Sequence, residues 1–230
     1  MIQADDIQDV DRLTEFLAGD HAKLQSYLGA AAFNMVGRRF ASKYPAGLAN
    51  LRWFSRHLAK FLSETRPYSK NPELAEFARL EIALSAAFEA PIAPILSVQE
   101  LDSYHLKDLQ QCRIVMHPSV QRLRFATNAT SLWAALRCEE RPPHPERLVE
   151  PSELLVWRQG AAARFRILGR EEAEVVDALA DGFTMAELKD TERGLPESET
   201  SVENVLSYVR GLAEAEVVSE VRRMKDIAEK

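Results

Sequence analysis

The histidines of this sequence are the first residues to consider for chemistry, because they can act as bases or as metal ligands. All five are scattered, and none lies at metal-ligand spacing from a cysteine or from another histidine: His21, His57, His105, His117 and His144. We interpret them as surface or hydrogen-bonded structural side chains. His117 differs because it opens the segment His-Pro-Ser between two extended pieces, where a role in a turn is favoured over a role as a ligand. The sequence predicts no metal site in this chain.

One glutamate and two cysteines are the other candidates. Glu81 lies on the mostly apolar helical face FARLEIALSAAF, where it could be a general base, although pairing with an arginine such as Arg79 is favoured. Cys112 and Cys138 could be redox-active, but no basic residues are arranged around both, which favours small buried side chains. No phosphate-binding loop, nucleophile elbow or metalloprotease helix occurs. We therefore predict no catalytic residue and no cofactor in this chain.

The composition is that of a soluble globular protein. Of 230 residues, 46% are hydrophobic and 28% are charged, which suits one large domain or two small ones. Two cysteines are too few for a disulfide framework, and the acidic start MIQADDIQDVD lacks the features of a signal peptide. No apolar run approaches the roughly 20 residues of a membrane helix. We expect a cytoplasmic protein.

The negative charge is concentrated in the C-terminal third. Residues 151–230 contain 11 lysines and arginines against 17 aspartates and glutamates, whereas residues 1–150 contain 18 of each. The net charge of −6 therefore falls entirely on the C-terminal part. A domain that binds duplex DNA normally has a basic surface, because neutralising phosphates supplies much of its affinity. This distribution argues against nucleic acid as a partner.

Residues 1–138 are expected to form a helical domain that positions any functional groups of the N-terminal part. Apolar residues recur at helical spacing and predict helices at 9–18, 20–28, 30–43, 47–63 and 72–90, and a last one that begins after Thr127 or Asn128 and ends near Arg137. The segment CRIVMHPSVQRLRF interrupts this period. It predicts a strand at 112–117 and a second extended piece at 119–125.

A proline-rich linker is expected at 139–151, because four prolines among charged residues prevent a continuous helix. Residues 152–230 then predict a winged-helix-like α+β domain. Its expected elements are strands at 154–157 and 164–168 around a turn at Gly160, a helix at 170–181 ended by Gly182, a short helix from a Thr184–Glu187 capping box to about Thr191, a third helix capped by Ser201, and a strand at 217–221. The predicted fold class is mainly α with a small β component.

The second strand of this hairpin could bind a peptide. Period-two alternation places Arg164 and Arg166 on one face, and Phe165 and Ile167 on the other. An edge strand with arginines beside an apolar groove could capture an extended, partly acidic peptide by strand addition. The residues alone favour a second interpretation by a modest margin, in which the arginines protect an exposed edge from aggregation.

Several segments together resemble one family, the HvfC/BufC family, whose N-terminal domain has carried the label of a DNA-binding domain. They are LGAAAFNMVGRRFASKYP (28–45), FSRHLAKFL (54–62), PELAEFARLEIALSAAFEAP (72–91), IVMHPSVQRLRFATNATSLWAAL (114–136) and LLVWRQGAAARFRILGREEAEVVDALADG (154–182). Each motif is modest alone. Their order and spacing cover nearly the whole chain.

The resemblance implies a non-catalytic partner subunit. Proteins of this type, like the more distant methanobactin partner protein MbnC, form heterodimers with multinuclear non-haem iron enzymes that oxidatively modify ribosomal precursor peptides. The iron belongs to the partner enzyme. The winged-helix-like C-terminal domain resembles a recognition element for the leader of the precursor peptide, and neither a membrane nor nucleic acid is an expected partner. The expected peptide-binding residues are Arg164, Phe165, Arg166, Ile167 and Leu168, with Val205, Tyr208 and Leu212 on the third helix of this domain.

Two alternatives stay open. The chain could be a DNA-binding transcriptional regulator, as the family label suggests, although the third helix SVENVLSYVRGLAEAE offers Arg210 as its single cation. It could also be an enzyme that uses Glu81 and His117, although nothing in the sequence brings these two residues together. The precursor peptide and the surface that meets the enzyme are not encoded in any recognisable motif.

Overall fold

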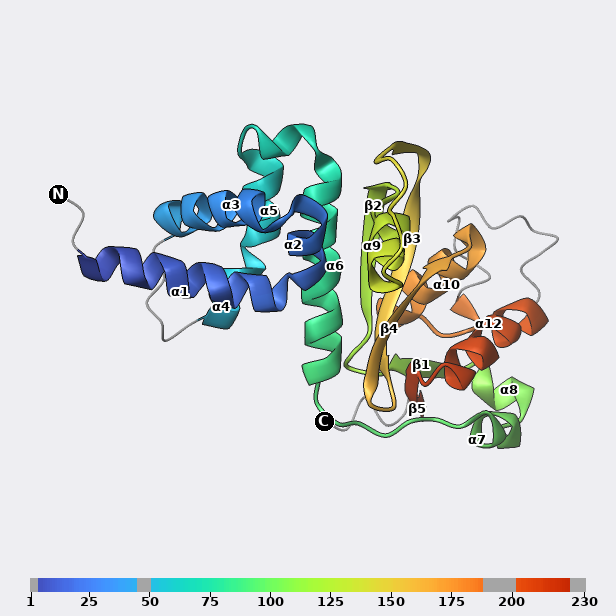
Figure 1. The fold of residues 1–230 in the computed structure, drawn as a ribbon. Helices are drawn as coiled ribbons and strands as arrows, with labels where there is room; N and C mark the ends of the chain where they lie inside the picture. The colour runs from blue at the N-terminus through green and yellow to red at the C-terminus, as the bar shows by residue number, and fades with distance from the viewer. Residues whose placement is uncertain (1–3, 45–50, 188–201, 224–230) are drawn as a thin grey trace. The chain divides into compact units, whose positions relative to one another are not determined.

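The computed structural model describes residues 4–44, 51–187 and 202–223 (Figure 1). The described chain is mainly α-helical, with a small β component of two antiparallel sheets, as expected. It forms two compact units, and each is built from two segments of the chain. None of the described helices is both long and apolar enough to cross a membrane.

Unit 1 contains residues Met1–Ser85 and Leu123–Ser152. Its helices are α1 (Ala4–Asp20), α2 (Ala22–Leu28), α3 (Ala30–Lys43), α4 (Leu51–Arg56), α5 (Leu58–Glu64), the short 3-10 helix η2 (Tyr68–Lys70), most of α6 (Pro72–Glu89), and α9 (Ala129–Arg137). The predicted helix at 30–43 is confirmed at both ends. The predicted helix at 47–63 is divided at His57, whose amide bonds to the carbonyl of Phe54 in a tighter turn.

The core of unit 1 is aromatic. Phe40 has ring neighbours on two other helices, with 4.6 Å between the ring centroids of Phe40 and Phe54 and 5.3 Å between those of Phe40 and Phe61. These rings are fully buried. Such edge-on and tilted aromatic pairs add to the apolar area that each ring removes from water.

Unit 2 contains residues Ala86–Arg122 and Glu153–Lys230. Its elements are α7 (Val98–Ser103), α8 (Leu106–Leu109), β1 (Cys112–Met116), β4 (Ala162–Leu168), α10 (Arg170–Ala180), α12 (Val202–Glu214) and β5 (Val218–Arg223). The chain passes between the two units inside α6, β2 (Gln121–Thr127) and β3 (Arg147–Gln159). These bounds differ from the expected division into 1–138, 139–151 and 152–230, because β3 begins inside the proline-rich segment and β1 joins unit 2.

The two sheets are small. β1 pairs with β5, which the sequence predicted at 217–221, and the other sheet has the order β2-β3-β4. The β3–β4 hairpin matches the expected one, with Gln159 opposite Ala162 across a two-residue turn. Gly160 has a φ of +55° in this turn, a conformation that glycine adopts without steric cost.

Helix ends in unit 2 follow local sequence signals. Gly182, with a φ of +84°, ends α10 as expected. The Thr184–Glu187 capping box is present, with the Glu187 amide 3.3 Å from Thr184 Oγ1 and the Thr184 amide 2.7 Å from Glu187 Oε2. The rest of that predicted helix to Thr191 and the Ser201 cap lie outside the described residues. A second capping box, Ser97 with Glu100, begins the unpredicted helix α7.

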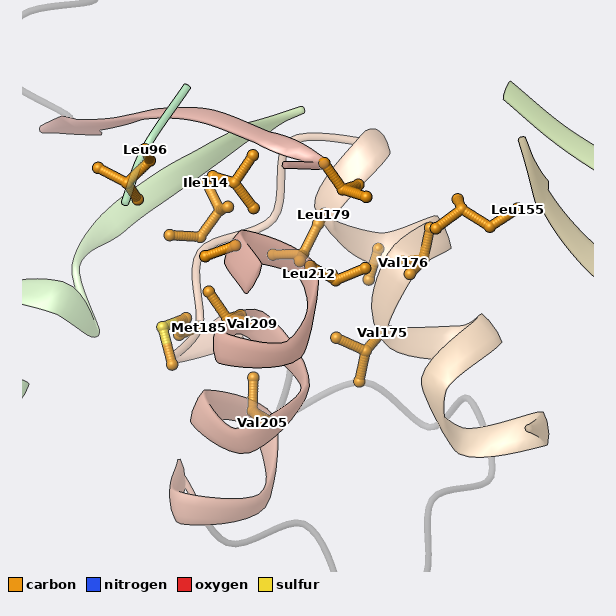
Figure 2. Close-up of a cluster of buried hydrophobic side chains, with 14 of the residues drawn as sticks. Leu96, Ile114, Leu155, Val175, Val176, Leu179, Met185, Val205, Val209 and Leu212 are labelled. Carbon is orange, nitrogen blue, oxygen red and sulfur yellow. The ribbon is translucent and has the colours of Figure 1, made fainter. Parts of the chain in front are cut away.

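One hydrophobic cluster holds unit 2 together (Figure 2). It joins side chains of β1, β3, α10 and α12 with two residues outside these elements, one before α7 and one after α10. Its buried members include Leu96, Ile114, Leu155, Val175, Val176, Leu179, Met185, Val205, Val209 and Leu212. The helical spacing of Val205, Val209 and Leu212 places all three on one face of α12. This core fixes α10 and α12 relative to the hairpin strand β3.

Candidate functional site: the free edge of β4

The expected peptide-binding strand lies at the edge of its sheet. Among the described strands, β4 pairs with β3 and with no other strand, because the order is β2-β3-β4. Its backbone groups on the side away from β3 are therefore not used by the sheet. An edge of this kind is a template for one further strand.

The register of the hairpin determines which backbone groups face outward. A two-residue turn closes on a hydrogen-bonded pair, here Gln159 with Ala162, and hydrogen-bonded pairs then alternate along an antiparallel ladder. Arg164 and Arg166 consequently use their backbone groups to bond β3. The amides and carbonyls of Ala163, Phe165 and Ile167 point to the open side.

The side chains of β4 share faces as the alternation predicted. Arg164 and Arg166 lie opposite Trp157 and Leu155, while Phe165 and Ile167 lie opposite Val156 and Leu154. Ile167 is 54% exposed, which is unusual for a large apolar residue on an ordered strand. Arg164 is also exposed, and Phe165 is half-buried. The edge strand thus offers one cation on one face and apolar surface on the other.

The side chain of Arg166, which the sequence predicts to contact a ligand, is instead bound to a carboxylate within the chain. Its guanidinium forms a two-pronged ion pair with Glu172 of α10, with Nη1 donating to Oε2 at 2.6 Å and Nη2 donating to Oε1. The hydrogen bonds that Arg166 donates to Glu172 raise the pKa of Arg166, against the opposing effect of its burial. Arg166 is therefore committed to joining β4 to α10.

The remaining predicted residues lie mostly in the core. Leu168, Val205 and Leu212 belong to the hydrophobic cluster and are 5%, 1% and 0% exposed, so they shape the unit without offering contact surface. Tyr208 packs against this cluster and donates its hydroxyl to Glu171 of α10 at 2.8 Å. The sequence does not predict the roles of Glu171 and Glu172. The pairs that they form, with Tyr208 on another helix and with Arg166 on a strand, have no fixed spacing in the sequence.

Several contacts hold the hairpin in place. The Gly160 amide donates to Glu216 at 2.8 Å, which ties the turn to the chain after α12. The Arg158 guanidinium donates to the carbonyls of Phe88, Ala90 and Pro91 at 2.7–3.2 Å, where it caps the C-terminal end of α6. A cation at this end also interacts favourably with the helix dipole.

The turn role favoured for His117 agrees with the contacts of its ring. The Ser119 amide and hydroxyl lie 3.2 and 2.8 Å from His117 Nδ1, and Ser119 Oγ accepts the Arg158 amide of β3 at 3.0 Å. Burial, and then the nearby positive charge of Arg158, lower the pKa of His117, although Glu216 opposes this. The neutral ring thus links the turn to the hairpin.

Glu81 is a structural carboxylate. It accepts hydrogen bonds from the backbone amides of Lys23 and Leu24 at 2.7 and 3.2 Å, at the start of α2. The arginine partner expected for it is replaced by these amides and by His21, whose Nδ1 lies 3.7 Å away. His21 in turn lies 3.0 Å from Ser55 Oγ. His21 and Ser55 are both fully buried, so this chain of polar groups is closed to a substrate in this structure.

The cysteines and other possible metal ligands are dispersed. Cys112 is buried, as expected, with its thiol 3.2 Å from the Asp108 carbonyl, whereas Cys138 is exposed. Within the described ranges, no group of three or more histidine, cysteine, aspartate or glutamate side chains is placed to hold a metal ion.

Comparison with known proteins adds no further identification. No protein-family model matches the chain, and no curated protein matches its sequence.

Proposed function

We propose that this protein is a non-catalytic partner subunit that binds the leader of a ribosomal precursor peptide and presents it to a multinuclear non-haem iron enzyme. The leader adds to β4 as a further antiparallel or parallel strand. The open edge of β4, with its outward amides at Ala163 and Ile167, is the observation that carries this proposal.

The site chemistry supports a peptide in particular. Strand addition takes its affinity from backbone hydrogen bonds and its selectivity from alternate side chains. Ile167 and the half-buried Phe165 provide apolar contacts for these side chains, and Arg164 provides a positive charge for an acidic residue. In unit 2 the hairpin is followed by α10, α12 and β5, an order that supports the winged-helix-like domain implied by the resemblance.

The DNA-binding alternative has weaker support. Arg210, the single cation in the sequence of α12, forms an ion pair with Asp102 at 2.6 Å. Glu203 and Glu214 belong to the same helix sequence. A recognition helix needs donors for phosphates and base edges, and α12 supplies few.

A pair of substitutions at Ile167 tests strand addition. Ile167→Pro removes an outward amide donor at a position where an edge strand tolerates proline, whereas Ile167→Thr keeps the amide and the β-branched shape. The chain is mixed with a labelled leader of the candidate precursor peptide, and binding is followed by fluorescence anisotropy. We expect the proline variant to lose about tenfold in affinity and the threonine variant to lose much less.

The same experiment separates the alternatives. Equal binding by wild type and Ile167→Pro would refute docking along β4. A labelled 20-base-pair duplex serves as the control ligand, and micromolar, salt-dependent binding to it would favour the DNA-binding function.

Partner formation is tested by co-expression with a candidate iron enzyme, where we expect a stable heterodimer on size-exclusion chromatography.

A further inference from the structure

A separate groove in unit 2 runs along β1. It has a volume of about 600 Å³, within the range of ordinary ligand sites, and four successive residues of β1 line it: Arg113, Ile114, Val115 and Met116. Val176, Leu179 and Ala180 of α10 form another wall. The lining is mostly apolar, with three arginines, Arg113, Arg122 and Arg222.

The strand beside this groove has an edge that the described sheet leaves mostly unpaired. β1 pairs with β5 on one side. On its other side, the described residues provide a single antiparallel bridge, between Arg113 and Thr184. Beyond that bridge, Val115 and Met116 line the groove. An extended segment could continue the pairing that Thr184 begins.

The arginines of the groove differ in how far their charge is neutralised. Arg122 donates to Glu153 at 3.1 Å and to Asp177 at 3.3 Å, so its charge is balanced by two carboxylates. Arg222 is paired with Glu220 of the same strand. For Arg113, by contrast, no described carboxylate lies within ion-pair distance. Its charge makes only a small contribution to lowering the pKa of Glu187, which is lowered mainly by the hydrogen bonds from Thr184.

Arg113 also occupies an unfavourable position without a ligand. It lies directly opposite Arg222 in the β1–β5 register, and like charges at opposed positions destabilise a sheet. Its Nε–H is buried and has no hydrogen-bond partner among the described residues, which carries a cost in free energy. The guanidinium is held against Gly182 at the end of α10, where an added Cβ would lie 3.6 Å from Nη1. A carboxylate in the groove would offset the like-charge repulsion between Arg113 and Arg222.

We propose that the β1–α10 groove binds an extended peptide segment that carries an acidic side chain between apolar ones, with Arg113 receiving the carboxylate. The apolar residues of the segment contact Val120 and Ala180, which line the groove and are not buried, and its backbone pairs with β1 beyond the Thr184 bridge. This site is distinct from the β4 edge, and the inference does not depend on leader binding there.

A short designed probe tests the groove. Two fluorescein-labelled peptides are used, Ser-Val-Glu-Val-Thr-Val and its counterpart with Gln in place of Glu. We expect the Glu peptide to bind the full chain about tenfold more tightly than the Gln peptide, because a hydrogen bond to a charged group is worth more than a neutral one. The Arg113→Gln variant should abolish this preference, whereas Arg170→Gln, at an exposed position at the start of α10, should leave it unchanged.

A second measurement keeps the inference testable if Arg113→Gln fails to fold. In amide NMR spectra of the wild-type chain, the Glu peptide should shift the signals of Val115 and Met116 and leave those of Phe165 and Ile167 in place. Equal affinity for the two peptides, shifts confined to β4, or displacement of the Glu peptide from Val115 and Met116 by a short DNA duplex would each overturn the assignment.

Discussion

Two buried carboxylates in α6, Glu73 and Glu76, have opposite effects on the stability of the fold, although they lie close together in the sequence. Glu76 accepts hydrogen bonds from the amides of Ala126 and Thr127 and from the Thr127 hydroxyl, so its charge is well solvated by the protein. Glu73 is 7% exposed, and its pKa is raised, first by this burial and further by the nearby Glu76, despite an opposing backbone hydrogen bond. The ionised form of Glu73 therefore costs stability.

Neutralising each glutamate should separate these roles. A raised folded-state pKa means that stability is lost as the pH rises through that pKa. We expect Glu73→Gln to raise the free energy of unfolding at pH 7 and to lose this advantage as the pH is lowered to about 4. Glu76→Gln should instead lower it by roughly 1.5–3 kcal/mol, since it weakens hydrogen bonds to a charged group. Urea unfolding across this pH range measures both, and a destabilised Glu73→Gln protein would contradict the assignment.

In unit 2, the lowered pKa of His117 gives the free energy of unfolding a pH dependence of opposite sign to that caused by Glu73. Its folded-state pKa is depressed, so the stability that the neutral ring provides is present above its ordinary pKa of 6.5 and is lost as the pH falls through the folded value. His117→Asn keeps an acceptor for the Ser119 amide but does not titrate. Between pH 7.5 and 5, we expect the wild type to lose more stability than this variant. Parallel pH profiles would show that His117 is not responsible.

At the scale of elements, two glycines near α10 and α12 provide a matched test of backbone conformation. Gly182 ends α10 with a φ of +84°, where an added side chain is strained. Gly211 lies within α12, and an added Cβ would contact nothing within 4 Å beyond the helix itself. Glycine in a helix interior is less favourable than alanine.

The two alanine substitutions should therefore change stability in opposite directions. We expect Gly182→Ala to lower the free energy of unfolding by about 1–2 kcal/mol and Gly211→Ala to raise it by about 0.5–1 kcal/mol. Thermal unfolding followed by circular dichroism measures both changes. A stabilising Gly182→Ala would mean that α10 does not end in the left-handed conformation.

Elements with strong local signals could be predicted from the sequence. The helix at 30–43 and the β3–β4 hairpin follow from apolar spacing and from a glycine turn, and Gly182 marks the end of α10. The helix α7 was missed because it has only six residues, although its Ser97–Glu100 capping box is a recognisable signal. The expected position of the second hairpin strand at a sheet edge agrees with the structure, whereas the pairing of Arg166 with Glu172 depends on a contact between elements that the sequence does not show.

At the scale of the whole molecule, the division into units could not be predicted from composition. The sequence marks a proline-rich segment as a linker, but β3 begins within it at Arg147 and passes from one unit into the other. Likewise β1 belongs with β5, which follows it by about a hundred residues. Long-range strand pairing of this kind leaves no local pattern, so chain order alone suggested two consecutive domains.

The central claim is that a leader peptide pairs with the outer edge of β4, and amide hydrogen exchange tests it most directly. The register assigns outward amides to Ala163, Phe165 and Ile167, whereas the amides of Arg164 and Arg166 already bond β3. On addition of the candidate leader, we predict strong slowing of exchange at Ala163 and Ile167 with little change at Arg164 and Arg166. Unchanged exchange at Ala163 and Ile167 under saturating leader would contradict docking of the leader along β4.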